Sequence, residues 1–243
     1  MRRFWNWLTS ERAKPLRDVG SIVLGVLIAL GIGEIADDVR WRFKVRDAET
    51  AMRAELGAIR RTLNERLAAN DCIMRRLDAI GGVLRAAAAG QPVPKLANLA
   101  APPYRLIENT AFEVARDEGV SLHMPRERWR MYAAAYGMAS GFYGSFADPE
   151  RARWDTLRLL DSTPGTISSD LASTLLVAWS EARAYALRQN ALAMQSDKAI
   201  ATLGVPIDWQ FDMDEGDPRS LAEQKARYAE GAMCKPLITP GAV

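Results

Sequence analysis

The chain has 243 residues, of which 49% are hydrophobic and 26% are charged, and its formal net charge at pH 7 is +2. This balance excludes a strong global field that would draw the chain onto nucleic acid, and basic residues do not form a stripe interleaved with aromatic ones. One histidine, His123, and two cysteines, Cys72 and Cys234, are too few for a clustered His/Cys metal site. We therefore expect no nucleic-acid partner, no metal and no other cofactor.

The first predicted element is a transmembrane helix over residues 16–36. Its uncharged centre, residues 19–33, reads VGSIVLGVLIALGIG, and the 16–36 segment is about 31 Å long at 1.5 Å per residue, enough to cross a hydrocarbon core of about 30 Å. Trp5, Trp7 and Trp41 flank it, as in an aromatic belt. A buried soluble helix and a signal peptide cleaved near Ala29 are the alternatives, but the apolar residues continue past Ala29.

One face of this predicted anchor carries small residues at every fourth position: Ser21, Gly25, Ala29 and Gly33, termed here the small-residue face. Such spacing lets the backbone of another helix approach closely in lipid. The pattern predicts a helix-packing face, and its partner is either a second copy of the chain or another membrane protein. The simpler alternative is that glycine and alanine are merely common in membrane helices.

The cysteines decide the predicted topology, because basic residues are evenly distributed on the two sides of the anchor. Two distant cysteines behind an export-like anchor favour a Cys72–Cys234 disulfide in an oxidising compartment, with two buried free thiols as the alternative. We expect a bacterial inner-membrane protein in which residues 1–15 are cytoplasmic and the C-terminal domain is periplasmic.

The remainder of the chain is predicted to be helical throughout. Residues 37–90 form a long amphipathic helix that continues from the anchor, with apolar residues three or four positions apart from Val45 to Leu84 and a bend expected at Gly81-Gly82. After a loop, residues 91–243 complete the bundle with helices expected over 103–118, 125–146, 148–160, 168–203 and 218–232. The predicted fold class is all-α: one transmembrane helix followed by an antiparallel helical bundle with a long first helix.

An aromatic stripe runs along the predicted helix 125–146, with Trp129, Tyr132, Tyr136, Tyr143 and Phe146 at helical spacing. It forms either part of the core, as such stripes usually do, or the lining of a ligand pocket. The acidic cluster Asp212, Asp214, Glu215 and Asp217 is interpreted as a solvated loop, because its glycine lies one position early for a calcium-binding EF-hand loop.

Catalytic signatures are absent from the sequence: there is no nucleophile elbow, phosphate loop, dinucleotide fingerprint or zincin motif. We therefore expect no enzyme, but a non-catalytic accessory or scaffold subunit that contacts membrane lipid and another inner-membrane protein. The main alternative is a ligand-binding or sensory bundle with an aromatic-lined pocket, and an enzyme with a carboxylate-based site is the third hypothesis.

The segment GVLIAL, followed by an acidic patch and a charged amphipathic helix, resembles an uncharacterised family of bacterial single-pass membrane-anchored helical proteins. The later stretch NTAFEVARDEGVSLHMP, followed by a helix with Tyr132 and Tyr136, is similar to a second region of that family. The resemblance spans about residues 18–145, with Phe112 where such families typically show a tryptophan. It implies placement in the inner membrane and no particular activity.

Overall fold

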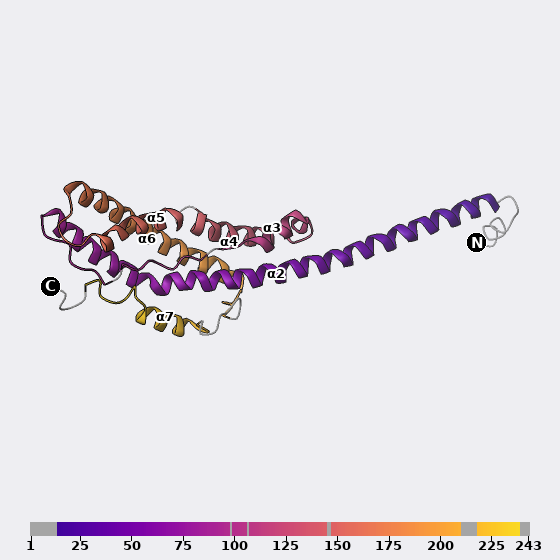
Figure 1. Ribbon diagram of the computed structural model, residues 1–243. Helices are drawn as coiled ribbons and strands as arrows, with labels where there is room; N and C mark the ends of the chain where they lie inside the picture. Colours follow the sequence, from indigo (N-terminus) through magenta and orange to yellow (C-terminus); the bar gives the residue numbers. More distant parts are fainter. Residues whose placement is uncertain (1–13, 98, 106, 145–146, 210–217, 239–243) are drawn as a thin grey trace.

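The computed structural model of the chain describes residues 14–97, 99–105, 107–144, 147–209 and 218–238 (Figure 1). Its helices are α2 (Lys14–Ala88), α3 (Thr110–Asp117), α4 (Arg126–Gly144), α5 (Ala147–Leu157), α6 (Ser169–Thr202) and α7 (Leu221–Glu230), with short 3₁₀ helices η2 (Val120–Leu122) and η3 (Arg158–Ser162). Within the described residues there is no β-strand, only the isolated bridges Val93–Gly165 and Leu96–Ile238. The chain is all-α, as predicted.

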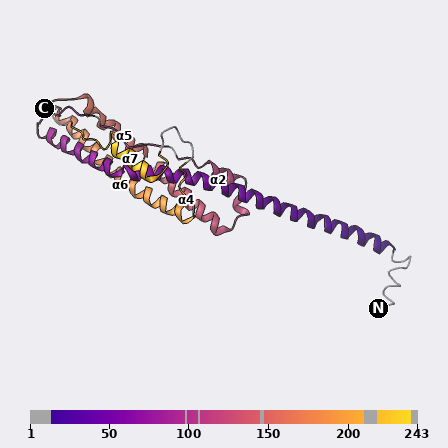
Figure 2. The same ribbon diagram turned by 90° about the horizontal axis from the view of Figure 1, so that it is seen from below.

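The helix α2 is continuous over 75 residues, so the predicted anchor and the predicted amphipathic helix form one element. Its N-terminal half projects from the rest of the molecule, while the other helices gather around its C-terminal half (Figures 1 and 2). Gly81 does not end the helix. Instead, Trp179 packs directly against it and donates a hydrogen bond from Nε1 to the carbonyl oxygen of Leu77 at 2.7 Å.

The helices α2 and α6 form the antiparallel centre of the bundle. Residue numbers rise along α2 as they fall along α6 in the paired contacts: Arg53 with the Leu203 carbonyl, Arg60 with Asp197, and Gly81 with Trp179. The α6 helix begins where the sequence predicts, because the hydroxyl of Ser168 accepts a hydrogen bond from the backbone N–H of Leu171. Helices α4 and α5 cover α6, and α7 packs against α2 (Figure 2).

The interior consists of two apolar clusters along the bundle. One surrounds Leu77 on α2, between α5, α6 and the C-terminal tail; the other surrounds Leu56, between α3, α4 and the end of α6. Between these clusters, buried polar residues come from three helices: Arg66 from α2, Gln189 from α6 and Glu150 from α5. A polar layer therefore divides the core.

Three predicted helix starts differ from the structure. Residues 103–105 and 107–109 are irregular and α3 begins at Thr110, because the segment after Pro103 lies along α2, where Arg105 pairs with Glu65. Helix α5 begins at Ala147, one residue before the predicted start, so Asp148 lies inside its first turn. The last helix begins at Leu221, where the hydroxyl of Ser220 accepts the cap hydrogen bond from the N–H of Glu223.

Candidate functional site: the outward face of α2

The N-terminal half of α2 carries an apolar segment that no other part of the described structure covers. Among the described residues, this is the one helix long and apolar enough to cross a membrane; its most apolar 18-residue window has a mean hydropathy of 2.2 and none of it is buried. Leu27 is 60% exposed and Ile35 is 66% exposed. A continuous apolar surface of this kind marks contact with lipid or with another protein.

The small-residue face lies along this exposed segment. Ser21, Gly25, Ala29 and Gly33 are all exposed. A Cβ atom added at Gly25 or at Gly33 would have no heavy atom of the protein within 4 Å. The face is therefore accessible to the backbone of a neighbouring helix.

The same side of α2 continues outward into the helical domain. Residues three or four positions apart share one face of an α-helix, and these residues share the outward face of α2: Ser21, Gly25, Ala29, Gly33, Ala36, Arg40, Phe43, Asp47, Ala51, Ala54 and Ala58. All are exposed except Ala58, which is half-buried. Small residues thus occupy both ends of a face that runs from the apolar segment to the bundle.

The outer end of this face borders a groove of about 810 Å³. Ala51, Ala54 and Ala58 form its wall on α2. The opposite wall consists of Tyr104, Arg105, Ile107 and Glu108. Glu55 holds the start of α3, which follows the opposite wall in the chain, because its carboxylate accepts hydrogen bonds from the backbone N–H of Ala111 at 3.1 and 3.2 Å. Alanine side chains leave room for a helix to approach the α2 backbone.

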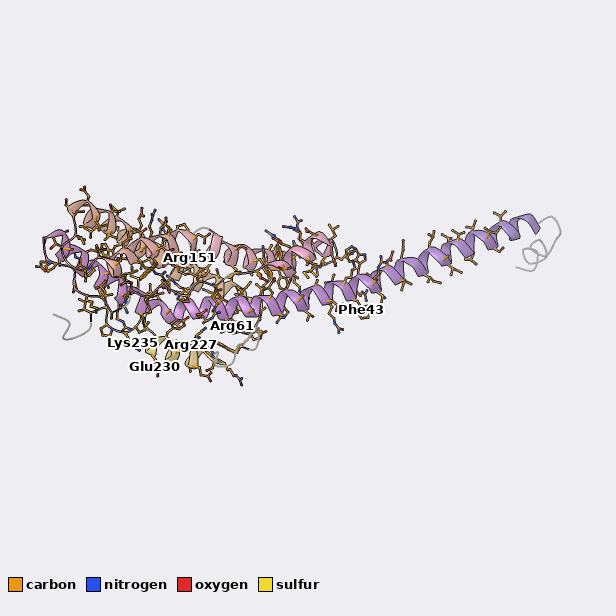
Figure 3. The ribbon with its side chains drawn as sticks, viewed as in Figure 1. Phe43, Arg61, Arg151, Arg227, Glu230 and Lys235 are labelled. Carbon is orange, nitrogen blue, oxygen red and sulfur yellow. A yellow bond between two sulfur atoms is a disulfide. The ribbon has the colours of Figure 1, made fainter. Side chains whose placement is uncertain are left out.

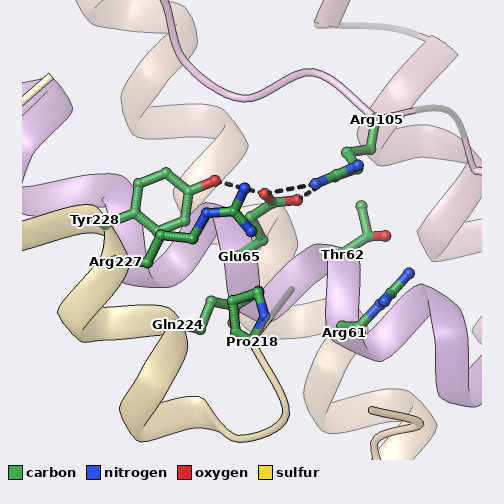
Figure 4. A pocket seen from close by; sticks show the side chains of 8 residues that line it. All are labelled: Arg61, Thr62, Glu65, Arg105, Pro218, Gln224, Arg227 and Tyr228. Atoms are coloured by element: carbon green, nitrogen blue, oxygen red, sulfur yellow. Dashed lines mark hydrogen bonds and ion pairs between the residues drawn. The ribbon is translucent and has the colours of Figure 1, made fainter. Parts of the chain in front are cut away.

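A three-way contact closes the groove at the end distant from the apolar segment (Figure 4). Arg105 Nε donates to Glu65 Oε2 at 2.8 Å, and the hydroxyl of Tyr228 from α7 donates to Glu65 Oε1. Burial raises the pKa of Tyr228, and the charge of Glu65 raises it further, so the phenol remains a donor. The adjoining cavity, about 20 Å³ between Thr62 and Gln224, is the size of one water molecule.

Behind the groove lies a buried ion pair. Arg66 Nη2 donates to Glu150 Oε1 at 2.8 Å, with side chains that are 4% and 1% exposed. Burial raises the pKa of Glu150, and the Arg66 charge opposes that shift. Burial also raises the pKa of Tyr104, which lines the groove. Since Glu65 and Glu150 each face a guanidinium, both carboxylates have the arrangement of structural ion pairs.

The structure joins Cys72 and Cys234 in a disulfide with Cα atoms 4.7 Å apart. Arg76, one turn along α2, donates from Nη2 to the carbonyl oxygens of Ala232 at 2.6 Å and Lys235 at 2.7 Å. The covalent bond and these hydrogen bonds hold the C-terminal tail against the first long helix. The joined elements are those that the sequence predicts.

The aromatic stripe of α4 lies in the core. Tyr132 and Tyr136 are buried and donate hydroxyl hydrogen bonds to Glu49 at 3.1 Å and to Glu55 at 2.6 Å, and Phe112 stacks on both Trp129 and Tyr136. The core alternative of the sequence analysis therefore describes these residues. Tyr143 lies in α4 without a described side chain, and Phe146 lies outside the described residues.

The remaining candidate residues are not brought together. His123 stacks on Trp41 with ring centroids 3.6 Å apart, whereas Trp5, Trp7 and the acidic cluster at Asp212, Asp214, Glu215 and Asp217 lie outside the described residues. Across the part of the chain that the structure describes, no three His, Cys, Asp or Glu residues are placed to hold a metal ion.

The groove is the feature that sequence reasoning missed. The regular spacing of Ala51, Ala54 and Ala58 is visible in the sequence, but the opposite wall comes from residues 104–108, which the sequence predicts to be helical. Comparison of the chain with protein-family models, curated proteins and solved structures finds no match. The family resemblance thus stays a prediction, and function is inferred from the geometry of α2.

Proposed function

We propose that this protein is a non-catalytic accessory or scaffold subunit, anchored in the bacterial inner membrane by residues 16–36, that packs against another inner-membrane protein. The observation that carries the proposal is the continuity of the outward face of α2. Its exposed small residues begin in the apolar segment and reappear as Ala51, Ala54 and Ala58 in the groove.

Close packing explains why small residues suit this role. Inside a bilayer the hydrophobic effect gives no preference for helix contact over lipid contact, so association depends on van der Waals packing at short range. Gly25 and Gly33 permit that approach within the membrane. The alanine wall of the groove permits it outside, so the partner presents a helix that continues from the membrane beside α2.

The disulfide supports the proposed compartment. Disulfides persist in oxidising environments such as the bacterial periplasm and are rare in the cytosol. Because the Cys72–Cys234 bond lies in the domain that follows the anchor, the domain is assigned to the periplasm and the N-terminus to the cytoplasm.

The test is a gentle-detergent pull-down of the tagged full chain from its native membrane, read by mass spectrometry. The test variant is Gly25→Leu with Gly33→Leu. The matched control is Gly20→Leu with Gly31→Leu, which adds the same side chains on the opposite side of the helix. None of the four glycines has a neighbouring heavy atom within 4 Å of an added Cβ, so the helical domain folds equally in both variants.

The proposal expects one membrane protein to co-purify with the wild type and the control and to be lost from the test variant. An Ala54→Arg variant, which places a charge in the groove, weakens the same capture. If the chain is recovered alone in all samples, or if both glycine pairs behave alike, the outward face is not a docking surface for another membrane protein. A complex composed only of copies of this chain also contradicts the proposal.

A further inference from the structure

A second cavity lies where α2 leaves the apolar segment. It measures about 270 Å³ and is lined by Asp38, Trp41, Arg42, Arg46, Glu49 and Arg128, among others. Most of these residues belong to α2, while Arg128 comes from the first turns of α4. This end of the bundle is the one that faces the projecting half of α2 (Figure 1).

The position of the cavity along α2 fixes its depth relative to a bilayer. With the anchor ending at Ala36, Asp38 and Trp41 lie about 3 and 8 Å beyond the hydrocarbon core at 1.5 Å per residue. The headgroup layer on each side of the core is about 5–8 Å thick. Arg42 and Arg46 start about 9 and 15 Å beyond the core at the same rise. Helical side chains tilt toward the N-terminus, so their guanidiniums reach back toward that layer.

The lining combines three guanidiniums with two carboxylates. Arg42 pairs with Asp38 at 2.7 Å and Arg128 pairs with Glu49 at 3.3 Å, while Arg46 has no ion-pair partner among the described residues. Guanidiniums bind phosphate oxygens through paired N–H donors. Exposed ion pairs such as Arg42–Asp38 contribute little by themselves, so a ligand that offers both charges can replace them.

The aromatic part of the site favours one kind of cationic group. One face of Trp41 is covered by the His123 ring, whose plane is 11° from parallel, and Lys44 Nζ lies 5.1 Å from the Trp41 ring centroid. Because the Trp41 ring is already engaged, a quaternary ammonium has no open aromatic cage. The Asp38 carboxylate instead suits a primary ammonium, which can donate hydrogen bonds to it. Glu49 already accepts from Arg128 and from the hydroxyl of Tyr132.

Exposed apolar residues surround the site at the same level. Leu122, beside His123, is 84% exposed, and Phe43 is 58% exposed. Figure 3 shows Phe43 projecting from α2 close to the end of the helical domain. Apolar and aromatic side chains that are exposed at this depth fit the interfacial region of a bilayer.

We propose that this cavity binds the headgroup of a phospholipid with a phosphodiester and a primary ammonium, of the phosphatidylethanolamine type. Arg42, Arg46 and Arg128 hold the phosphate, and Asp38 holds the ammonium. The bound headgroup seats the end of the bundle on the membrane surface. This inference rests on the proposed membrane anchoring but is independent of the partner protein.

The test uses the full chain purified in a maltoside detergent and incubated with equal amounts of phosphatidylethanolamine, phosphatidylglycerol and phosphatidylcholine, followed by native mass spectrometry. The test variant combines Arg42→Gln, Arg46→Gln and Arg128→Gln. The control combines Arg151→Gln, Arg158→Gln and Arg219→Gln, which removes the same charge from exposed sites elsewhere. The wild type and the control should retain phosphatidylethanolamine, and the test variant should retain about tenfold less, as expected for loss of charge-assisted hydrogen bonds.

A second variant, Asp38→Asn, removes the carboxylate proposed for the ammonium and keeps the three guanidiniums. It should bind phosphatidylethanolamine and phosphatidylcholine equally, because the donors to the phosphate remain. Equal retention in the two triple variants, or preference of the wild type for phosphatidylglycerol, would overturn the proposal. Alkaline extraction of membranes with the same variants reports anchoring separately: if all chains leave the membrane, the anchor itself is wrong, whereas lost retention with intact anchoring concerns the cavity alone.

Discussion

Two stretches of the single helix α2 have similar apolar side chains and opposite surroundings. Between residues 19 and 35 the apolar side chains are exposed, with Leu27 at 60%, whereas from Met52 to Leu84 the inward-facing ones are buried, with Leu77 at 0%. The difference is not one of helix formation, since hydrogen bonding continues without a break from Lys14 to Ala88. The difference is whether other helices cover the stretch: they cover one side of residues 52–84 and leave residues 19–35 uncovered.

The arrangement of polar residues explains the difference. Along residues 52–84, termed here the outer stretch, charged residues such as Arg61 and Asp78 alternate with apolar ones. One side of the helix therefore packs on α6 while the other meets water. Residues 19–35, termed here the inner stretch, are apolar on all sides except at Glu34, so no single apolar face directs them onto the bundle. The bundle covers the outer stretch, and under the proposed anchoring a membrane covers the inner one. The effect of a substitution therefore depends on its stretch.

The largest expected effect concerns the outer stretch alone and comes from the disulfide. Cys72→Ala with Cys234→Ala releases a cross-link between positions 162 residues apart and should lower the free energy of unfolding of the bundle by about 5 kcal/mol in the chain-entropy model. Denaturant unfolding in detergent, followed by tryptophan fluorescence, measures it. Adding reductant to the wild type is the control and should give the same loss. Unchanged stability in both would show that the cross-link does not stabilise the bundle.

The next effect concerns the polar layer between the two apolar clusters. Arg66→Met leaves the Glu150 carboxylate buried without its partner and should destabilise the bundle by about 4 kcal/mol. The double variant Arg66→Met, Glu150→Leu should regain most of that loss. Arg40→Gln, which removes the exposed pair with Asp37, should change stability by less than about 1 kcal/mol.

The same ion pair gives a pH dependence with a definite sign. Burial raises the pKa of Glu150 above its ordinary 4.5 in the folded state, so the folded protein binds this proton more readily than the unfolded chain does. The contribution of Glu150 to stability therefore decreases as pH rises above about 4.5. The decrease should be steeper in Arg66→Met, which lacks the opposing charge, and absent in Glu150→Gln; equal slopes in all three proteins would contradict this assignment.

A leucine pair compares the two stretches directly. Leu77→Ala empties part of the core and should lower the free energy of unfolding by about 3 kcal/mol. Leu27→Ala removes the same atoms from a side chain that contacts no part of the bundle, and it should leave the unfolding of the bundle unchanged. A loss of similar size in both variants would mean that the inner stretch packs against the bundle after all.

The sequence was sufficient wherever the pattern is local. The apolar run at 19–33 and the hydroxyl cap at Ser168 both depend on neighbours within a few residues. It was insufficient where partners are distant: Glu65 and Arg105 are 40 residues apart and Arg66 and Glu150 are 84 apart. Nothing near Arg105 indicates that its segment is held against α2 in place of forming the first turns of a helix.

Gly81 and Gly82 show how the same pattern can mislead at single-residue resolution. A pair of glycines in a helix predicts a bend, but the structure assigns the two residues different roles. A Cβ added at Gly81 would lie 2.5 Å from Cζ2 of Trp179, whereas one added at Gly82 would meet nothing within 4 Å. Only Gly81 therefore needs to be glycine. Because it has no side chain, the indole of Trp179 can reach the carbonyl oxygen of Leu77.

The smallest expected effects follow from these roles and have opposite signs. Gly82→Ala should raise the free energy of unfolding by about 1 kcal/mol, because alanine restricts the unfolded chain and favours the helix. Gly81→Ala gains the same helix propensity but must displace Trp179, so it should lower stability by about 1–2 kcal/mol. Trp179→Phe should reduce the penalty of Gly81→Ala in a double-mutant cycle and leave Gly82→Ala unaffected. Stabilisation by both alanines would show that Trp179 moves aside freely, and close packing of α6 on the outer stretch of α2 would then not depend on Gly81.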